Sequence, residues 1–299
     1  MATFALQVQP ENAAEWLDTA RQAETAGFTA LYVADHPGSG ASPFVALAAA
    51  AAVTSTIKLG SYVVNAGVRE PMLLAADVAT LDVVSGGRAV LGLGAGHTPA
   101  EWAAVGKVRP AVAGRVERFI AVAEATAQLL AGAEVTVDVP ELTMLRAALG
   151  APACVQERVP LLFGGGNSRL LRWAAAHADV IGLSGLGRTL ADGHSHEVRW
   201  RGAEIDAQVE LAAGKPIEAL VQQVEITDDA GAFYAAKAAE LAMPESELRA
   251  APYLLAGTTD EIVDAVREHG RRWGITRFAV RRTALHDLGP LLPKLASID

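Results

Sequence analysis

The chain has 299 residues, of which 51% are hydrophobic, and its formal net charge is −9. This acidic balance excludes a typical nucleic-acid-binding protein, and the single cysteine, Cys154, excludes an internal disulfide and a cysteine-rich metal site. No signal peptide is apparent and no apolar stretch is long enough to span a bilayer, so we expect a cytoplasmic protein without membrane or nucleic-acid partners.

Short apolar runs alternate with longer helical patterns along the chain. In chain order, the runs that predict strands are 3–8, 28–35, 56–65, 88–94, 159–165, 179–185, 216–226 and 275–280. The patterns that predict helices are 11–26, 43–53, 71–86, 113–130, 168–178, 198–213, 231–241, 259–273 and a last helix from 285. A loop with Trp102 and Pro110 is expected after the fourth strand, without a helix at its start.

Eight strands that are mostly followed by helices favour an α/β fold of the (β/α)8 barrel type over an open sheet. The strands are continuous apolar runs, as expected for strands that are buried on both faces. We expect one barrel domain over 1–299, with insertion or lid segments at 132–158 and 184–198. The second of these is polar and includes His194 and His196, for which no third metal ligand is evident.

The stretch LDVVSGGRAVLGLGAGH, residues 81–97, brings a glycine-rich loop directly after the fourth strand. A dinucleotide-binding fingerprint reads G-x-G-x-x-G, whereas here the third glycine position holds His97. That fingerprint also opens its fold, and this loop does not. Two alternatives remain: tight packing of strand against loop, or close approach of the backbone to a ligand.

Polar and glycine residues also follow the other strands, and the carboxyl ends of barrel strands form the active-site face. The candidates are Asp35 and His36 after the second strand, Ser61, Tyr62 and Asn65 in the third, Ala95, Gly96 and His97 after the fourth, and Gly164, Gly165, Gly166 and Asn167 after the fifth. The amides of the last group begin a helix and suit a phosphate.

Four stretches carry a resemblance to a known family: LYVADHP, LDVVSGGRAVLGLGAGH, PLLFGGGNSRLLRWAAAHADVIGL and LLAGTTDEIVDAVREHGRRWGITRFAV. Together they resemble the bacterial luciferase-like monooxygenases, and more closely the branch that uses the deazaflavin coenzyme F420. The resemblance implies a TIM-like barrel, usually a homodimer, with a flavin or deazaflavin at the carboxyl-terminal mouth and a small-molecule substrate.

The same resemblance assigns cofactor-binding positions. It places His36, with Asp35 beside it, near the cofactor ring, and a bulge with a non-proline cis peptide at Ser61–Tyr62 behind the ring. It places Ala95, Gly96 and His97 at the ring and its side chain. The segment of Gly164, Gly165, Gly166 and Asn167 lines the cofactor's tail. Asn65 lies at the same mouth.

His36 and His97 are the candidate catalytic residues, because histidine titrates nearest neutrality. His36 either acts as an acid or base or only hydrogen-bonds the cofactor, and His97 either acts in catalysis or only lines the pocket. Asp35 either orients His36 or caps a turn. Tyr62 and Trp102 are candidate walls of the substrate site, with loop packing as the alternative for Trp102.

One departure from the family concerns a sugar-phosphate dehydrogenase branch. That branch has a catalytic glutamate at the position of His97 and an aromatic residue shortly after the position of His36, where this chain has PGSGAS. That substrate is therefore not expected. The first hypothesis is an F420-dependent oxidoreductase that moves a hydride to or from a small organic molecule. The alternatives are an FMN-dependent monooxygenase and a non-catalytic flavin-binding protein.

Overall fold

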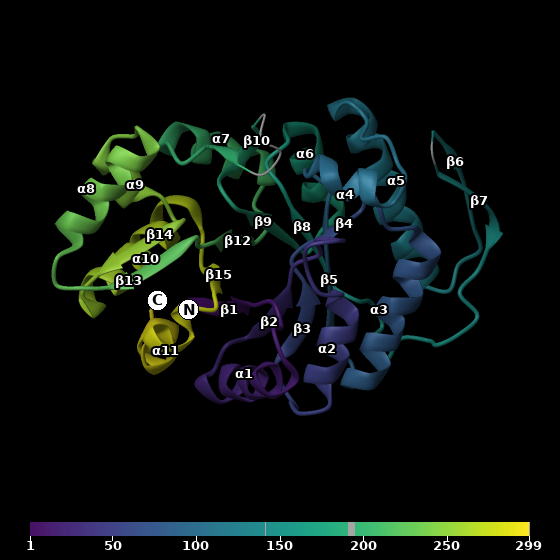
Figure 1. Cartoon of the computed structure of the whole chain (residues 1–299), viewed down its shortest axis with the longest axis horizontal. Coiled ribbons are helices and arrows are strands. Elements are labelled where there is room, and N and C mark those ends of the chain that lie inside the picture. Colours follow the sequence, from purple (N-terminus) through teal and green to yellow (C-terminus); the bar gives the residue numbers. More distant parts are fainter. Residues whose placement is uncertain (141, 191–194, 299) are drawn as a thin grey trace.

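Eight parallel strands close into a barrel at the centre of the molecule (Figure 1). The computed structural model describes residues 1–140, 142–190 and 195–298. The barrel strands are β1 (Thr3–Gln7), β2 (Ala30–Val33), β3 (Lys58–Ser61), β5 (Ala89–Gly94), β8 (Leu161–Gly164), β9 (Val180–Leu183), β12 (Ile217–Leu220) and β15 (Arg277–Arg281). Because β15 pairs with β1 and β3 pairs with β5, the barrel is closed, and the predicted fold class is confirmed.

Helices cover the outside of the barrel. They are α1 (Ala13–Ala26), α2 (Pro43–Ala51), α3 (Pro71–Ser85), α5 (Val112–Leu130), α6 (Ser168–His177), α7 (Gly202–Ala212), α10 (Thr259–Trp273), α11 (Ala284–Leu288) and α12 (Leu292–Ala296), with a 3₁₀ turn at Gly289–Leu291. Local signals fix their ends. The Asn12 side chain accepts a hydrogen bond from the Glu15 amide at the start of α1, and Gly27, with φ 95°, ends it.

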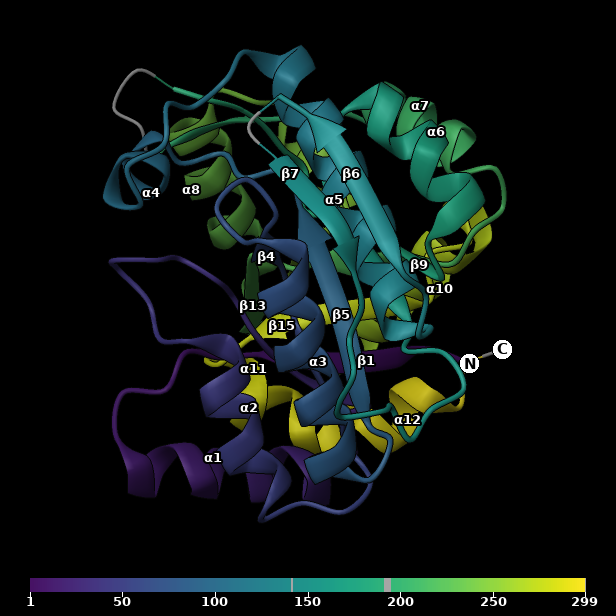
Figure 2. The same cartoon turned by 90° about the vertical axis from the view of Figure 1, so that its right-hand side faces the viewer.

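The two predicted insertions each contain an antiparallel hairpin. The first pairs β6 (Val135–Val139) with β7 (Leu142–Ala147), packs against α5 and forms the outer edge of the molecule (Figures 1 and 2). The second pairs β10 (Leu186–Thr189) with β11 (His196–Val198) near the barrel mouth. His194 lies outside the described residues.

The predicted strand 216–226 is wrong as a single element. It splits into β12 in the barrel and β13 (Gln223–Ile226), which pairs with β14 (Leu254–Gly257) in a separate sheet beside α8 (Ala230–Leu241) and α9 (Glu245–Ala250). The main chain changes partners at this point. The Val221 amide still donates to the Ala279 carbonyl of β15 in the barrel, whereas the Gln222 amide donates to the Tyr253 carbonyl. This change depends on tertiary pairing, which the apolar run does not reveal.

A second difference follows β5. The expected loop begins with a short helix, α4 (Pro99–Ala104). Its first residue is a proline, whose fixed φ suits the first helical position. This helix carries Glu101 into the barrel mouth, which matters for the site described below.

The core lies between the barrel and its helices, and a smaller cluster with Tyr32, Tyr62 and Leu220 fills the barrel interior. The last helix of the chain, α12, packs against the first strand, β1. Among the described residues, no helix is long and apolar enough to cross a membrane.

Candidate active site

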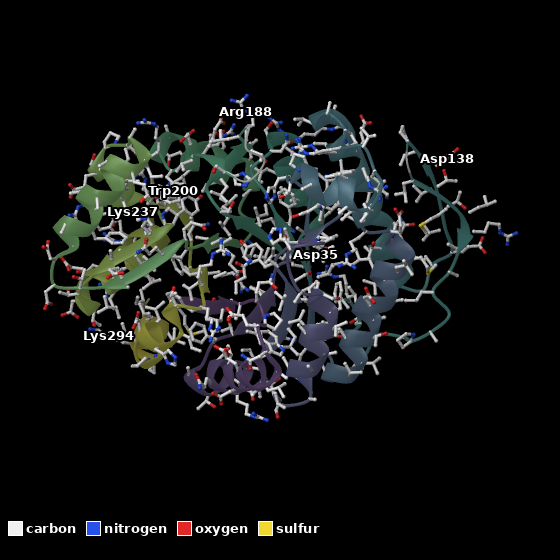
Figure 3. All side chains as sticks on the ribbon, in the orientation of Figure 1. Asp35, Asp138, Arg188, Trp200, Lys237 and Lys294 are labelled. Carbon is white, nitrogen blue, oxygen red and sulfur yellow. The ribbon has the colours of Figure 1, made fainter. Side chains whose placement is uncertain are left out.

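A cavity of about 640 Å³ opens at the carboxyl ends of the barrel strands. Residues at or just beyond the ends of all eight strands line it, among them Gln7, His36, Tyr62, His97, Gly164, Ser184, Leu220 and Arg281. In Figure 3, Asp35, which also lines the cavity, lies near the middle of the molecule, and Arg188 lies at the upper edge. The volume is that of a typical ligand pocket.

The third strand ends in a bulge that forms part of the cavity wall. Its cis peptide joins Tyr62 to Val63, so the expected position at Ser61–Tyr62 is wrong by one residue. The reason is the register of the sheet: Ser61 still pairs with Val33, and the Tyr62 amide still donates to the Val33 carbonyl. The chain leaves the ladder after Tyr62 and resumes at β4 (Val64–Asn65), which pairs with the end of β5.

Glycines on three neighbouring strands make room for this bulge. A Cβ atom on Gly92 would lie 1.9 Å from the Ser61 carbonyl oxygen, and one on Gly94 or Gly164 would lie 2.6 Å from a Val63 methyl group. A Cβ on Gly182 would lie 2.4 Å from the Tyr62 hydroxyl. The alternating glycines of the fourth strand therefore serve close packing of strand against bulge, while Gly94 and Gly164 also line the cavity.

His36 is held by a buried carboxylate. Its Nδ1 lies 2.7 Å from Oε1 of Glu101, whose side chain is only 5% exposed, and this hydrogen bond raises the pKa of His36 despite partial burial. The same contact, together with one from Asn65, lowers the pKa of Glu101 against the effect of burial. Since Glu101 engages Nδ1, Nε2 is the ring nitrogen left for a ligand.

The pair is fixed from behind by further polar contacts. Nδ2 of Asn65 donates to the second oxygen of Glu101 at 2.5 Å, and the Asn65 amide donates to Asp35 at 3.3 Å. Asp35 is buried and accepts two hydrogen bonds from Arg69, at 2.7 and 3.0 Å. Among the described residues, the Asp35 carboxylate accepts hydrogen bonds from Asn65 and Arg69, and so it supports these two residues.

His97 lies at the rim of the same cavity. Its ring stands edge to face with that of His36, with 6.1 Å between centroids, and with that of His196 at 4.6 Å. The residue is exposed, but the surrounding protein atoms still desolvate the ring, and this, with the neighbouring His196, lowers the pKa of His97. His97 is therefore neutral near pH 7, whereas the pKa of His36 is shifted in the opposite direction.

Two arginines, one just before α5 and one in its first turn, line the cavity together with the glycine segment after β8. Arg109 and Arg115 line the cavity together with Gly165 and Gly166, and their Nε atoms are buried without a hydrogen-bond partner among the described residues. Nη1 of Arg115 donates to the Gly96 carbonyl at 3.1 Å. The Asn167 side chain caps α6 by accepting from two amides. This end of the cavity is cationic and suits an anionic group.

The other predicted residues divide between the cavity surface and its support. Tyr62, Asn65, Ala95, Gly96 and the segment 164–167 lie on the surface. Ser61 lies behind it and exchanges two hydrogen bonds with Gly92. Trp102 is fully buried against Gly67, behind the wall and away from the cavity.

Sequence reasoning missed Glu101, Gln7, Arg281, Arg109 and Arg115. The pattern Thr98-Pro99 followed by an acidic first turn is a helix-start signal that would have placed Glu101 near His97. No three His, Cys, Asp or Glu side chains gather to hold a metal ion in the part of the chain that the structure describes.

Comparison with known proteins gives one family and several similar folds. The family model described as luciferase-like monooxygenase matches residues 1–277. A 5,10-methylenetetrahydromethanopterin reductase of Methanopyrus kandleri is 43% identical over 74 residues, a match that covers 25% of this chain and only 21% of that reductase.

Two solved structures superpose over nearly the whole chain. The coenzyme F420-dependent tetrahydromethanopterin reductase of Methanopyrus kandleri does so with a TM-score of 0.74 and 18% identity, covering 97% of this chain and 99% of that one. A riboflavin lyase with modified FMN does so with a TM-score of 0.77 and 14% identity, covering 100% and 93%. At these identities the likeness concerns the fold alone.

Proposed function

Because the chain belongs to the luciferase-like monooxygenase family, we propose that it is a coenzyme F420-dependent oxidoreductase that moves a hydride between the deazaflavin and a small organic substrate. The observation that carries this proposal is the pair of His36 and buried Glu101 on the cavity wall. Reduction of a C=O or C=C bond by a hydride needs a proton donor beside it, the reverse oxidation needs a proton acceptor, and a His with a raised pKa can serve in either role.

The residues present fit a flavin-like cofactor. The bulge at Tyr62 and Val63 offers a wall for a flat ring, and the glycines at 164–166 add no side chain that would block a ring or its tail. The orphaned Nε atoms of Arg109 and Arg115 fit an anionic tail. When bound, the deazaflavin would supply two-electron hydride chemistry.

The chain's own contribution is positioning and proton management. Glu101 and Asn65 hold the His36 ring in one orientation, so that Nε2 faces the cavity with a proton to give or a lone pair to receive it. Neutral His97 at the rim supplies a hydrogen-bonding group beside His36. The β10–β11 hairpin contacts the loop after β5, where the Thr189 hydroxyl donates to the His97 carbonyl at 3.4 Å, and residues of this hairpin line the cavity.

An FMN-dependent monooxygenase is the second candidate. It is favoured by the family's description and by the similar fold of an enzyme that holds modified FMN. Two assays over one panel of small alcohols, aldehydes and enones separate the candidates. The proposal expects F420-linked turnover without oxygen. Oxygen consumption with reduced FMN, together with no substrate turnover with F420, would contradict the proposal. Binding without any turnover would favour a non-catalytic flavin-binding protein.

Substitution of Arg115 tests the anion end of the cavity. We expect Arg115→Gln to raise the Kd of F420 by about 10-fold or more, because one charge-assisted hydrogen bond to an oxyanion is lost. The difference in F420 affinity between wild type and Arg115→Gln should be smaller at high salt, because salt screens the charge. Fluorescence titration measures both effects. Arg146→Gln is the matched control, since Arg146 is an exposed arginine on the β6–β7 hairpin that pairs with Glu134. An equal effect in both variants would refute a local role for Arg115.

We further propose that the protein is a homodimer that pairs through α2 and α3. These neighbouring helices expose three apolar side chains, Val45 (72%), Leu73 (68%) and Val84 (52%), which a contact between two copies of the chain would cover. Light scattering is expected to give about twice the chain mass of 31.1 kDa, and the double variant Val45→Asp, Leu73→Asp should give the monomer mass. A monomer at micromolar wild-type concentration would contradict this.

A further inference from the structure

The floor of the cavity carries a cation that no carboxylate balances. Arg281 is the last residue of β15, lines the cavity and is half-buried, and its desolvation lowers the pKa of the guanidinium group. No carboxylate lies within salt-bridge distance of it among the residues that the structure describes. Buried charges in proteins are normally paired, because an isolated one costs several kcal/mol.

Two glutamine side chains fix the orientation of this guanidinium group. Nη1 of Arg281 donates to Oε1 of Gln7, and Nη2 donates to Oε1 of Gln222 at 2.9 Å. Each amide nitrogen is engaged elsewhere: Gln7 donates to the Tyr62 carbonyl, and Gln222 donates to the carbonyls of Ser184 and Leu220. Both amides are thereby locked with their oxygens toward the arginine.

The amides orient the guanidinium but leave its charge uncompensated. An arginine has five N–H donors in a planar fork, and the two glutamines take two of them. The remaining donors suit a planar, two-oxygen acceptor. Neutral amide oxygens do not offset a full positive charge, so the balancing anion would arrive with a ligand.

We infer that Arg281 binds a carboxylate group of the substrate on the cavity floor. A carboxylate matches the remaining fork in shape, and its single negative charge matches the single guanidinium better than a phosphate dianion does. Arg109 and Arg115, at the α5 side of the cavity, are left for the cofactor's anionic tail. His36 lines the same cavity as Arg281, so a substrate held by its carboxylate at Arg281 would occupy the space that His36 also borders. This inference names a substrate class for the proposed hydride transfer and rests on that proposal.

The neighbouring residue provides a matched control. Arg282 is the arginine directly after β15, but it pairs with Glu11 and Glu15 and is not among the residues that line the cavity. Arg281→Gln and Arg282→Gln remove the same charge from adjacent positions. Arg281→Lys keeps the charge and loses the planar fork.

Ligand-observed NMR with benzoate and its neutral isostere benzamide tests the inference, on the purified chain with and without F420. We expect wild type and Arg282→Gln to prefer benzoate. Arg281→Gln should weaken benzoate binding by about 10-fold or more and abolish the preference, with unchanged thermal melting and F420 affinity, and Arg281→Lys should lie between. Undiminished benzoate binding in Arg281→Gln, or a loss of F420 affinity in its place, would overturn the inference.

The two proposals fail separately. A benzoate preference that depends on Arg281 in a protein that binds neither F420 nor FMN would contradict the proposed function and leave the carboxylate site standing. Normal F420 turnover with equal binding of benzoate and benzamide would contradict the carboxylate site and leave the proposed function standing.

Discussion

Replacement of His36 by alanine is expected to lower kcat by about 10²–10⁴-fold while the Kd of the cofactor changes little. The expectation follows from the geometry: Glu101 occupies Nδ1, and Nε2 is left to move a proton in the cavity. Steady-state kinetics and a fluorescence titration measure the two quantities. Full turnover with normal cofactor binding would remove the acid or base role of His36.

Glu101 is a positioning residue, and its substitution extends this test to pH. The hydrogen bond from His36 to Glu101 is the largest cause of the raised pKa of His36. Glu101→Gln removes the charge, so the limb of the kcat profile that belongs to His36 should move to lower pH. A merely structural role for Glu101 would lower activity without moving that limb.

Replacement of Gly92 by alanine is expected to lower the free energy of unfolding by about 3 kcal/mol, near the upper end of the usual range for overpacking. A Cβ at this position would lie 1.9 Å from the Ser61 carbonyl oxygen, and a backbone atom cannot turn aside as a side chain can. The bulge that walls the cavity would have to shift, so cofactor affinity should fall as well. Urea unfolding and fluorescence titration measure the two effects.

Gly150→Ala is the control for this variant. A Cβ on Gly150 meets nothing within 4 Å, so its free energy of unfolding should change by no more than about 0.5 kcal/mol. Equal stability of the two variants would mean that Gly92 has another role than close packing against the bulge.

The barrel fold, and the end of the barrel at which the site lies, could be predicted because both follow from the order of apolar runs and helices in the sequence. Apolar runs followed by helices predict the parallel strands, and strand ends predict that His36, Asn65 and the segment 164–167 converge. Ser61 and Tyr62 show the limit of this reasoning: whether a residue is still in the ladder depends on its pairing with Val33, which no local pattern encodes.

The missed residues have two physical causes. Glu101 lies on a six-residue helix that is too short to show a helical period. Arg281 is the last residue of an apolar strand, and its importance comes from the absence of a carboxylate around it in the described structure. The Thr98-Pro99 start of that helix can be read from the sequence. The contact of Glu101 with His36 and the lack of a carboxylate near Arg281 in the described structure depend on tertiary neighbours, which spacing alone does not give.

The most direct measurement is a pair of equilibrium titrations of the purified protein, one with F420 and one with FMN, followed by fluorescence. We expect F420 to bind more tightly than FMN and Arg115→Gln to weaken F420 binding. Tight binding of FMN alone would contradict this expectation and favour the monooxygenase.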